Sequence, residues 1–340
     1  MRFIFCVQAS ATIGLGHLMR CQALAQTVIA HDMDAVFLLD DETRRIALAR
    51  QDWQGQILPF DYAVPLAQQL SNLQATLPFP IEWIVVDGYQ FTRDFCQQWR
   101  DLGHRVALFD DDVHETPLAA DAVINAAHPP DEERHHLFGS DFRLLRREFK
   151  TVMPLSVSQR FHLTLNFGGS DPFGLTIPLL KCLASVEFDA PIRVVTGGAY
   201  QQVEELNKAI NDLPLSIQHI HDAQDMADVW SHARLAISAA GGSQFEIAVC
   251  KTPAILVVVA ENQITASQQA EQEGWCRIHY LHDVSETEKA GILADIARQA
   301  KQLWSEADTL SQMQDALNER YDAFGGERLM DALLELSSCN

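Results

Sequence analysis

The segment RFIFCVQASATIGLGHLMRCQALAQTVI, residues 2–29, joins a short apolar run to a stretch of helical periodicity through a turn with two glycines. The run Arg2–Val7 is rich in aromatic and β-branched residues, which is typical of a strand. Beyond the turn, Leu18, Cys21 and Leu24 recur at the spacing of one helical face. The segment therefore predicts a strand, a tight turn and an amphipathic helix, which together form the repeating unit of an α/β sheet.

The same alternation continues through the first half of the chain. Between the strand-like runs, residues such as Phe95, Trp99 and Leu102 share one helical face. The further runs are Ala35–Leu39, Gln56–Phe60, Trp83–Val86, Val106–Phe109 and Ala122–Ile124. Strands that alternate with helices predict a parallel sheet covered by helices on both faces.

The pattern starts again after a stretch of basic residues, serines and a proline near residues 148–160, which we interpret as a linker. The new runs are His162–Phe167, Ile192–Val195, Leu215–Gln218, Leu235–Ser238 and Ala254–Val259, and consecutive helices follow from about Val284. We predict Rossmann-like domains at residues 1–152 and 153–325, and a C-terminal helix at 326–340. Paired open sheets bind ligands in the cleft between them, at the carboxyl ends of their strands.

Composition narrows the class of ligand. The formal net charge of −21 argues against nucleic acid and anionic membranes as partners, because both would be repelled. The seven cysteines are scattered without a CxxC pair, which is typical of a reduced, cytoplasmic protein. The N-terminal apolar run is too short for a signal peptide, and no stretch has the length of a membrane helix. We expect backbone amides and a few local cations to hold any anionic ligand.

The first candidate motif is the turn that contains Gly14, Gly16 and His17. Exposed amides at a helix start suit a phosphate or a developing oxyanion, and an imidazole there can act as a general base. Arg20, one helical turn later, can reach an anion or remain solvated. This stretch alone favours an ordinary βα turn with a surface histidine over a catalytic one.

The second candidate motif follows the first strand of the second half and contains Gly168, Gly169 and Ser170. Its amides are candidates for ligand binding. Asp171 and Pro172 come next, and they could instead cap a helix that has proline as its first residue.

The third candidate motif is SAAGGSQFE, which contains Gly241, Gly242, Ser243 and Glu246. Ser243 and Glu246 have the spacing of a capping box, so both could serve the helix alone. Alternatively, the amides of residues 242–244 bind a diphosphate and Glu246 binds the vicinal hydroxyls of a ribose. The motif by itself does not separate these interpretations.

The acidic run FDDDVH invites a metal-site interpretation, since Asp110, Asp111, Asp112 and His114 follow a strand. Adjacent side chains in a strand or loop point in different directions and do not converge on one ion, so we predict no metal. Downstream, His135 and His136 lie in a charged stretch that we interpret as a solvated helix face.

Taken together, these motifs resemble the UDP-2,4-diacetamido-2,4,6-trideoxy-β-L-altropyranose hydrolases of pseudaminic acid biosynthesis. That family has a GT-B fold and is related to nucleotide-sugar glycosyltransferases and spore-coat polysaccharide proteins. The matching stretches, in family order from Ile13 to Leu329, are IGLGHLMRC, VVDGY, FDDD, ADAVIN, LLRREF, FGGSDPFGLT, SAAGGSQFE, PAILVVVAENQ and FGGERL.

The resemblance implies roles for individual residues. His17 becomes the base that activates water, while Tyr89 and Asn262 match positions that contact the diphosphate and sugar. The UDP-binding turn is matched by Gly242, Ser243 and Glu246. The chain departs from the family at Cys6 and Gln8, which replace an arginine and an aspartate, and at Gly88, which replaces a histidine. The missing aspartate removes one way of orienting the imidazole.

The implied reaction is hydrolysis of a UDP-sugar at the anomeric carbon, in the cytoplasm, ahead of nonulosonic acid synthesis and flagellin glycosylation. UDP is a good leaving group, so the resemblance implies neither metal nor cofactor. The expected partner is a UDP-sugar, and we expect a monomer. Two alternatives remain: a GT-B glycosyltransferase that uses an acceptor hydroxyl instead of water, and a nucleotide-sugar binding protein without activity.

Overall fold

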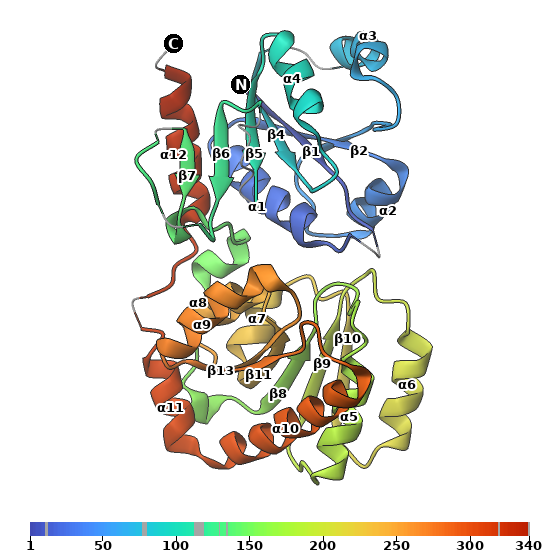
Figure 1. Cartoon of the computed structure of the whole chain (residues 1–340), viewed down its shortest axis with the longest axis vertical. Helices are drawn as coiled ribbons and strands as arrows, with labels where there is room; N and C mark the ends of the chain where they lie inside the picture. Colours follow the sequence, from blue (N-terminus) through green and yellow to red (C-terminus); the bar gives the residue numbers. More distant parts are fainter. Residues whose placement is uncertain are drawn as a thin grey trace. The chain divides into compact units, whose positions relative to one another are not determined.

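The computed structural model describes residues 1–10, 13–76, 80–111, 119–128, 130–133, 135–318 and 320–338. It divides into two compact units, which Figure 1 shows in sequence colours. The N-terminal unit comprises Met1–Arg147 and Ala323–Asn340, and the C-terminal unit comprises Glu148–Asp322. The structure thus divides the chain at 147/148 and 322/323, where the sequence suggests 152/153 and 325/326, and it groups the C-terminal helix with the N-terminal unit.

The described residues of the N-terminal unit form a parallel sheet of seven strands in the order β3-β2-β1-β4-β5-β6-β7. The strands are β1 Arg2–Val7, β2 Asp34–Leu39, β3 Gln56–Pro59, β4 Ile81–Asp87, β5 Arg105–Phe109, β6 Ala122–Asn125 and β7 His136–Phe138. The helices are α1 Gly16–Ala30, α2 Asp41–Ala49, α3 Leu66–Thr76, α4 Arg93–Asp101 and α12 Gly325–Ser338, with the 3-10 turn η1 Ser140–Phe142.

The core of this unit explains why its strands appear in the sequence as apolar runs. Every residue of β1 is buried, and Ile4, Val36, Ile84 and Val106 from four strands pack into one apolar cluster. Burial on both faces of the sheet requires continuous apolar runs rather than alternating ones.

The C-terminal helix packs on α1 at a close approach that requires glycine. A Cβ at Gly325 would lie 2.0 Å from the carbonyl oxygen of Arg143, and one at Gly326 would lie 2.5 Å from Thr27 Oγ1 on α1. Any larger side chain would therefore push α12 away from the unit, which accounts for the two glycines of FGGERL.

The C-terminal unit repeats the architecture with a six-stranded parallel sheet in the order β10-β9-β8-β11-β12-β13 among its described residues. The strands are β8 His162–Asn166, β9 Ile192–Thr196, β10 Ile217–His221, β11 Ala233–Ala239, β12 Ala254–Val258 and β13 Cys276–Tyr280. The helices are α5 Thr176–Ser185, α6 Val203–Asp212, α7 Met226–Ser231, α8 Ser243–Val249, α9 Ile264–Gln272, α10 Glu286–Ser305 and α11 Ala307–Asp315, with 3-10 turns η2 Arg147–Thr151, η3 Val157–Gln159 and η4 Glu261–Gln263.

Both sheets are doubly wound, and the strand order locates the switch point of each. The order in which successive strands are added to the sheet reverses between β1 and β4 in one sheet and between β8 and β11 in the other, while all strands stay parallel. Ligands of open α/β sheets bind beside the carboxyl ends of the strands at such points. The turns after these four strands contain all three glycine motifs and the VVDGY motif.

One prediction about local structure is wrong. The stretch with His135 and His136 is not a helix face, because His136–Phe138 forms β7 and pairs in parallel with β6. The ring of His136 stacks on Phe138 with centroids 4.5 Å apart, an arrangement that alternate residues on one face of a strand allow. Here tertiary pairing outweighs the local abundance of charge.

Candidate functional site

The turn after β1 positions His17 at the second residue of α1. Gly14 has φ +85°, a left-handed conformation that favours glycine, and its amide donates to the carbonyl of Ser10 at 2.8 Å. Helix α1 begins at Gly16 after the N-cap residue Leu15, and no side chain of the described residues caps it there. The first helical turn is therefore free of competing acidic groups, and His17 lies at its start.

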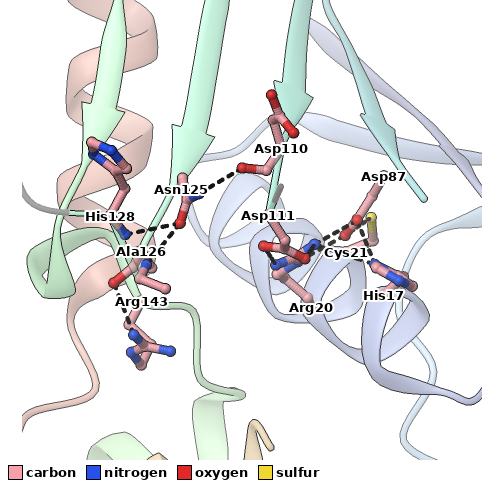
Figure 2. Close-up of polar contacts among 11 residues, drawn as sticks. His17, Arg20, Cys21, Asp87, Asp110, Asp111, Asn125, Ala126, His128 and Arg143 are labelled. Carbon is pink, nitrogen blue, oxygen red and sulfur yellow. Dashed lines mark hydrogen bonds and ion pairs between the residues drawn. The ribbon is translucent and has the colours of Figure 1, made fainter. Parts of the chain in front are cut away.

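Asp87 is the direct partner of His17. It is the last residue of β4, its side chain is completely buried, and its Oδ1 lies 2.7 Å from His17 Nδ1 (Figure 2). Val7 at the end of β1 pairs with Asp87 across the sheet, so the turn that carries His17 passes directly beside the carboxylate. The switch point of the sheet thus brings together two residues that are 70 positions apart in the chain.

Arg20 lies between two carboxylates. Its Nε and Nη2 donate to the two oxygens of Asp87 at 2.9 and 2.6 Å. Its Nη1 and Nη2 donate to the two oxygens of Asp111 at 2.8 and 3.0 Å. The guanidinium also lies over the Phe109 ring, 4.5 Å from the centroid. Both pairs are bidentate, which is the strongest geometry for an arginine and a carboxylate.

These contacts determine the charge of the buried groups. Burial alone would raise the pKa of Asp87, but the charge of Arg20 and the hydrogen bonds from His17 and Arg20 outweigh it, and the pKa is lowered. Burial would lower the pKa of Arg20, but Asp87 and Asp111 raise it well above its ordinary value. Asp87 is therefore an ionised carboxylate paired with the charged guanidinium of Arg20.

An ionised Asp87 selects the tautomer of His17. A carboxylate can only accept, so the 2.7 Å contact places a proton on Nδ1 and leaves the lone pair of a neutral imidazole on Nε2. Nη2 of Arg20 is also 3.2 Å from Nδ1, but its hydrogens have nearer acceptors on Asp87 and Asp111. The arrangement presents Nε2 as a proton acceptor.

A small pocket opens beside this imidazole. Its volume is about 60 Å³, and its lining combines polar and apolar groups: His17, Gly88, Tyr89, Phe91, Thr92, Cys96, Leu108, Phe109, Asp110 and Asp111. The exposed ring of Tyr89 meets that of His17 edge to face, with centroids 5.0 Å apart. The pocket has room for a few water molecules or one substituent of a larger ligand.

The three positions that depart from the resembled family have plain structural settings. Cys6 is buried, and burial raises the pKa of its thiol, so it is an inert core residue. Gln8 donates a hydrogen bond to Asp40 and not to His17. Gly88 has φ +141°, a conformation that a histidine would adopt only with strain. The carboxylate that contacts His17 comes instead from the neighbouring strand β4, as Asp87.

In the C-terminal unit, the turn after β8 contains Gly168, Gly169 and Ser170. Asp171 follows with φ +48° and accepts from the amides of Leu175 and Thr176, both at 2.9 Å. Asp171 thus binds the amides of the N-cap residue Leu175 and of the first helical residue Thr176, but the alternative in which Pro172 begins the helix is wrong. Helix α5 begins at Thr176, because the left-handed Asp171 starts a loop that its own side chain then closes.

The Gly169 turn touches the next loop of the same sheet. A Cβ added at Gly197, directly after β9, would lie 2.6 Å from both Cα and the carbonyl oxygen of Gly169. The glycines therefore allow two backbones to meet at the carboxyl edge of the sheet. This contact holds the Gly168–Ser170 turn at the switch point.

The turn after β11 is not built as a capping box. The N-cap of α8 is Gly242, and no described side chain caps it, while Ser243 is the first helical residue. Glu246 instead accepts from Trp230 Nε1 at 3.3 Å. The capping-box alternative for Ser243 and Glu246 is therefore wrong.

The ENQ motif forms the 3-10 turn η4 after β12. Asn262 is exposed, whereas Gln263 accepts from the amide of Val259 at 3.0 Å, and its Nε2 would lie 3.8 Å from a Cβ at Gly241. Gln263 therefore borders the Gly241 turn, although the resemblance points to its neighbour Asn262. Its contact was missed because the motif alone does not say which amide faces the sheet.

Two absences concern only the described residues. Within them, no group of three or more His, Cys, Asp or Glu side chains is arranged to hold a metal ion. Of the acidic run, Asp111 is paired with Arg20, and Asp112 and His114 lie outside the described residues. No helix in the part of the chain that the structure describes is long and apolar enough to cross a membrane.

The sequence is similar to that of known proteins. Residues 165–323 match the family model of the glycosyltransferase family 28 C-terminal domain. Among curated proteins, the chain is 24% identical over 304 residues to uncharacterized protein MJ1062 of Methanocaldococcus jannaschii, which covers 84% of this chain and 60% of the relative. The chain thus spans about 60% of the length of that relative.

Solved structures share the fold along the whole chain. MurG of Acinetobacter baumannii superposes with a TM-score of 0.65 at 15% identity, covering 98% of this chain and 100% of its own. UGT2 of Phytolacca americana, solved with UDP-2-fluoroglucose and pterostilbene, has a TM-score of 0.62 at 14% identity and covers 99% and 100%. The chain has a GT-B fold, with two Rossmann-like parallel-sheet domains.

Proposed function

We propose that this protein binds a UDP-sugar and transfers its glycosyl group from UDP to an oxygen acceptor that His17 deprotonates. The observation that carries the proposal is the buried Asp87 beside His17, which binds Nδ1 of the imidazole and so leaves Nε2 as the nitrogen that can accept a proton. A base oriented by a carboxylate, at the switch point of a doubly wound sheet, is suited to activating a hydroxyl group.

The nucleotide half of the proposal rests on the C-terminal unit. Its match to a glycosyltransferase domain includes the turns after β8 and β11. We assign the diphosphate to the amides of Gly241, Gly242 and Ser243, and the ribose hydroxyls to Glu246. We assign supporting contacts to the amides of Gly168, Gly169 and Ser170 and to the exposed Asn262.

The N-terminal unit then supplies the acceptor chemistry. The bond between the anomeric carbon and the β-phosphate oxygen breaks, and UDP leaves with the electron pair. The acceptor oxygen forms the new bond to carbon, and its proton goes to Nε2 of His17. General base catalysis of this kind contributes roughly 10²- to 10⁴-fold. We assign Tyr89 and the amides of Gly14 and Gly16 to substrate contacts beside the imidazole.

Two acceptors fit this chemistry, and different observations favour them. The family 28 match and a structural neighbour solved with both a UDP-sugar and pterostilbene favour an acceptor hydroxyl, which makes the protein a glycosyltransferase. The motif resemblance and a pocket of only about 60 Å³ beside His17 favour water, which makes it a UDP-sugar hydrolase. Transfer to a hydroxyl is our first candidate, and hydrolysis is the second.

One experiment separates them. The purified protein is incubated in oxygen-18 water with UDP-N-acetylglucosamine and with a UDP-2,4-diacetamido-2,4,6-trideoxyhexose, each with and without a panel of hydroxyl acceptors. Transfer predicts UDP release that depends on an acceptor. Hydrolysis predicts release without an acceptor and oxygen-18 on the anomeric carbon. Tight binding of UDP without turnover under any condition would contradict both and indicate a binding protein.

A further inference from the structure

Arg20 lies beside the candidate base, with Nη2 3.2 Å from His17 Nδ1, and most of its donors are already engaged. All three of its side-chain nitrogens donate to carboxylate oxygens, two of them to Asp87 and two to Asp111, with Nη2 serving both. The arginine side chain is 24% exposed and that of Asp111 is 23% exposed, whereas Asp87 is completely buried. The pair of bidentate contacts thus links a buried carboxylate to the wall of the pocket (Figure 2).

We propose that Arg20 is a positioning residue: clamped by Asp111, it holds Asp87 so that Asp87 can hold His17, and it does not bind the substrate's diphosphate. This inference rests on the proposed function for its kinetic consequences. The clamp itself is defined by the contacts and has consequences that are measurable without any substrate.

Charge is the first argument for this role. Asp87 and Asp111 together carry two negative charges against the single positive charge of Arg20, so the cluster has a net charge of −1 when His17 is neutral. A diphosphate would meet a guanidinium whose charge is already exceeded by its partners. An anion site of this kind needs uncompensated donors, and Arg20 has given nearly all of its donors to carboxylates.

Geometry is the second argument. Asp87 has two oxygens, and Arg20 contacts both, while His17 contacts one of them and Cys21 Sγ lies 3.7 Å from the other. A carboxylate held by a planar fork cannot rotate, so the oxygen that faces His17 keeps its position. Asp111 applies the same restraint to Arg20 from the other side.

The test compares three variants with matched controls. Arg20→Gln removes the charge and the fork, Arg20→Lys keeps the charge but loses the fork, and Asp111→Asn loosens the anchor. The controls are Arg50→Gln and Asp52→Asn. They break a similarly buried bidentate pair of the same unit, with contacts of 2.8 and 2.6 Å, that does not contact His17.

Kinetics distinguishes positioning from substrate binding. We expect kcat to fall about 100-fold in Arg20→Gln and about 10-fold in both Arg20→Lys and Asp111→Asn, with KM for the UDP-sugar unchanged within about twofold. The controls keep the wild-type kcat. A diphosphate ligand would behave in the opposite way: KM would rise at least about tenfold in Arg20→Gln, and Asp111→Asn would lower KM by releasing the guanidinium. That result would overturn the proposal.

NMR tests the clamp without turnover. In protein labelled with ¹³C at aspartate side chains, the Asp87 carboxyl stays ionised to lower pH in the wild type and in the controls than in Arg20→Gln. The ¹⁵N signals of the His17 ring show Nδ1 protonated in the wild type and a mixture of tautomers in Arg20→Gln. Unchanged Asp87 and His17 signals in that variant would refute the clamp. If the wild type turns over no UDP-sugar, the proposed function fails, while this measurement still decides the role of Arg20.

Discussion

Replacement of Asp87 by asparagine is the most informative single change at the candidate site. The two side chains have nearly the same shape, so Asp87→Asn alters charge and hydrogen bonding and leaves packing intact. The carboxylate accepts from His17 Nδ1 and from two nitrogens of Arg20, all within 2.9 Å. An amide has one accepting oxygen, so its NH₂ group must face a donor of either His17 or Arg20.

The expected loss of unfolding free energy follows from the burial of Asp87, and the expected fall in kcat follows from the tautomer of His17. Removing one partner of a buried ion pair costs about 3–5 kcal/mol of unfolding free energy, and we expect the lower end because Arg20 keeps Asp111. The imidazole loses the acceptor that fixes Nδ1–H, and mispositioning a base in this way lowers kcat by about 10²- to 10⁴-fold. KM should change little, because Asp87 is completely buried and does not reach a substrate.

The assay measures UDP release by the variant at a temperature below its unfolding midpoint. That midpoint is determined by thermal unfolding of the same sample. The matched control is Asp52→Asn, which removes a largely buried carboxylate bound by Arg50 and Arg146. We expect that control to lose stability and keep its kcat. If Asp87→Asn is folded and its kcat is within about twofold of the wild type, Asp87 does not orient the base and the reasoning is refuted.

Three further predictions concern the glycine loop after β9, the hydrogen bonds of Asp171 and the charge of Asp87. Gly197→Ala should weaken UDP binding at least about tenfold, because its Cβ would displace the Gly169 backbone. The control Gly198→Ala, whose Cβ has contacts no closer than 3.3 Å, should bind UDP like the wild type. Equal affinities of the two variants by calorimetry would contradict this. Asp171→Ala should lower the unfolding free energy by about 1–2 kcal/mol in urea through the loss of two cap bonds, and Asp171→Asn should restore most of it; no loss in the alanine variant would contradict the capping role. Because the pKa of Asp87 is lowered by folding, its contribution to stability is present above about pH 4 and declines as pH falls through the folded value, so Asp87→Asn should show a flatter loss of stability in acid; parallel curves would count against the ionised pair.

The sequence pattern was sufficient for most of the fold. Buried parallel strands are continuous apolar runs, so Arg2–Val7 and Ala254–Val258 are visible as strands without any knowledge of their partners. The pattern failed at one edge of each sheet, at β7 and β13. β7 carries charged neighbours, and β13, with the sequence CRIHY, is only partly buried, so neither has the composition of an interior strand.

Only part of the candidate site could be predicted from the sequence. The position of His17 in a glycine turn is local information, and the sequence shows it directly. Its partner is not local: Asp87 reaches His17 because β4 pairs with β1, and strand order is a property of the whole sheet. The available signal was a carboxylate that ends the apolar run WIVVD, because a charged residue in a buried strand needs a partner.

The capping interpretations show the same limit. SxxE spacing at Ser243 and the Asp-Pro pair at Asp171 both fit known helix starts, yet α8 begins at Ser243 itself and α5 begins four residues after Pro172. Helix boundaries depend on the path of the preceding loop, which positive φ at Asp171 redirects. Spacing alone does not contain that path.

The central claim is that His17 accepts the proton of the attacking oxygen. The most direct measurement is the rate of UDP release from the UDP-sugar substrate by His17→Ala, with His31→Ala at the other end of α1 as the control. The account predicts a fall in kcat of about 10²- to 10⁴-fold for His17→Ala, an unchanged KM, and a wild-type rate for the control. A His17→Ala protein that releases UDP at the full rate would contradict the account.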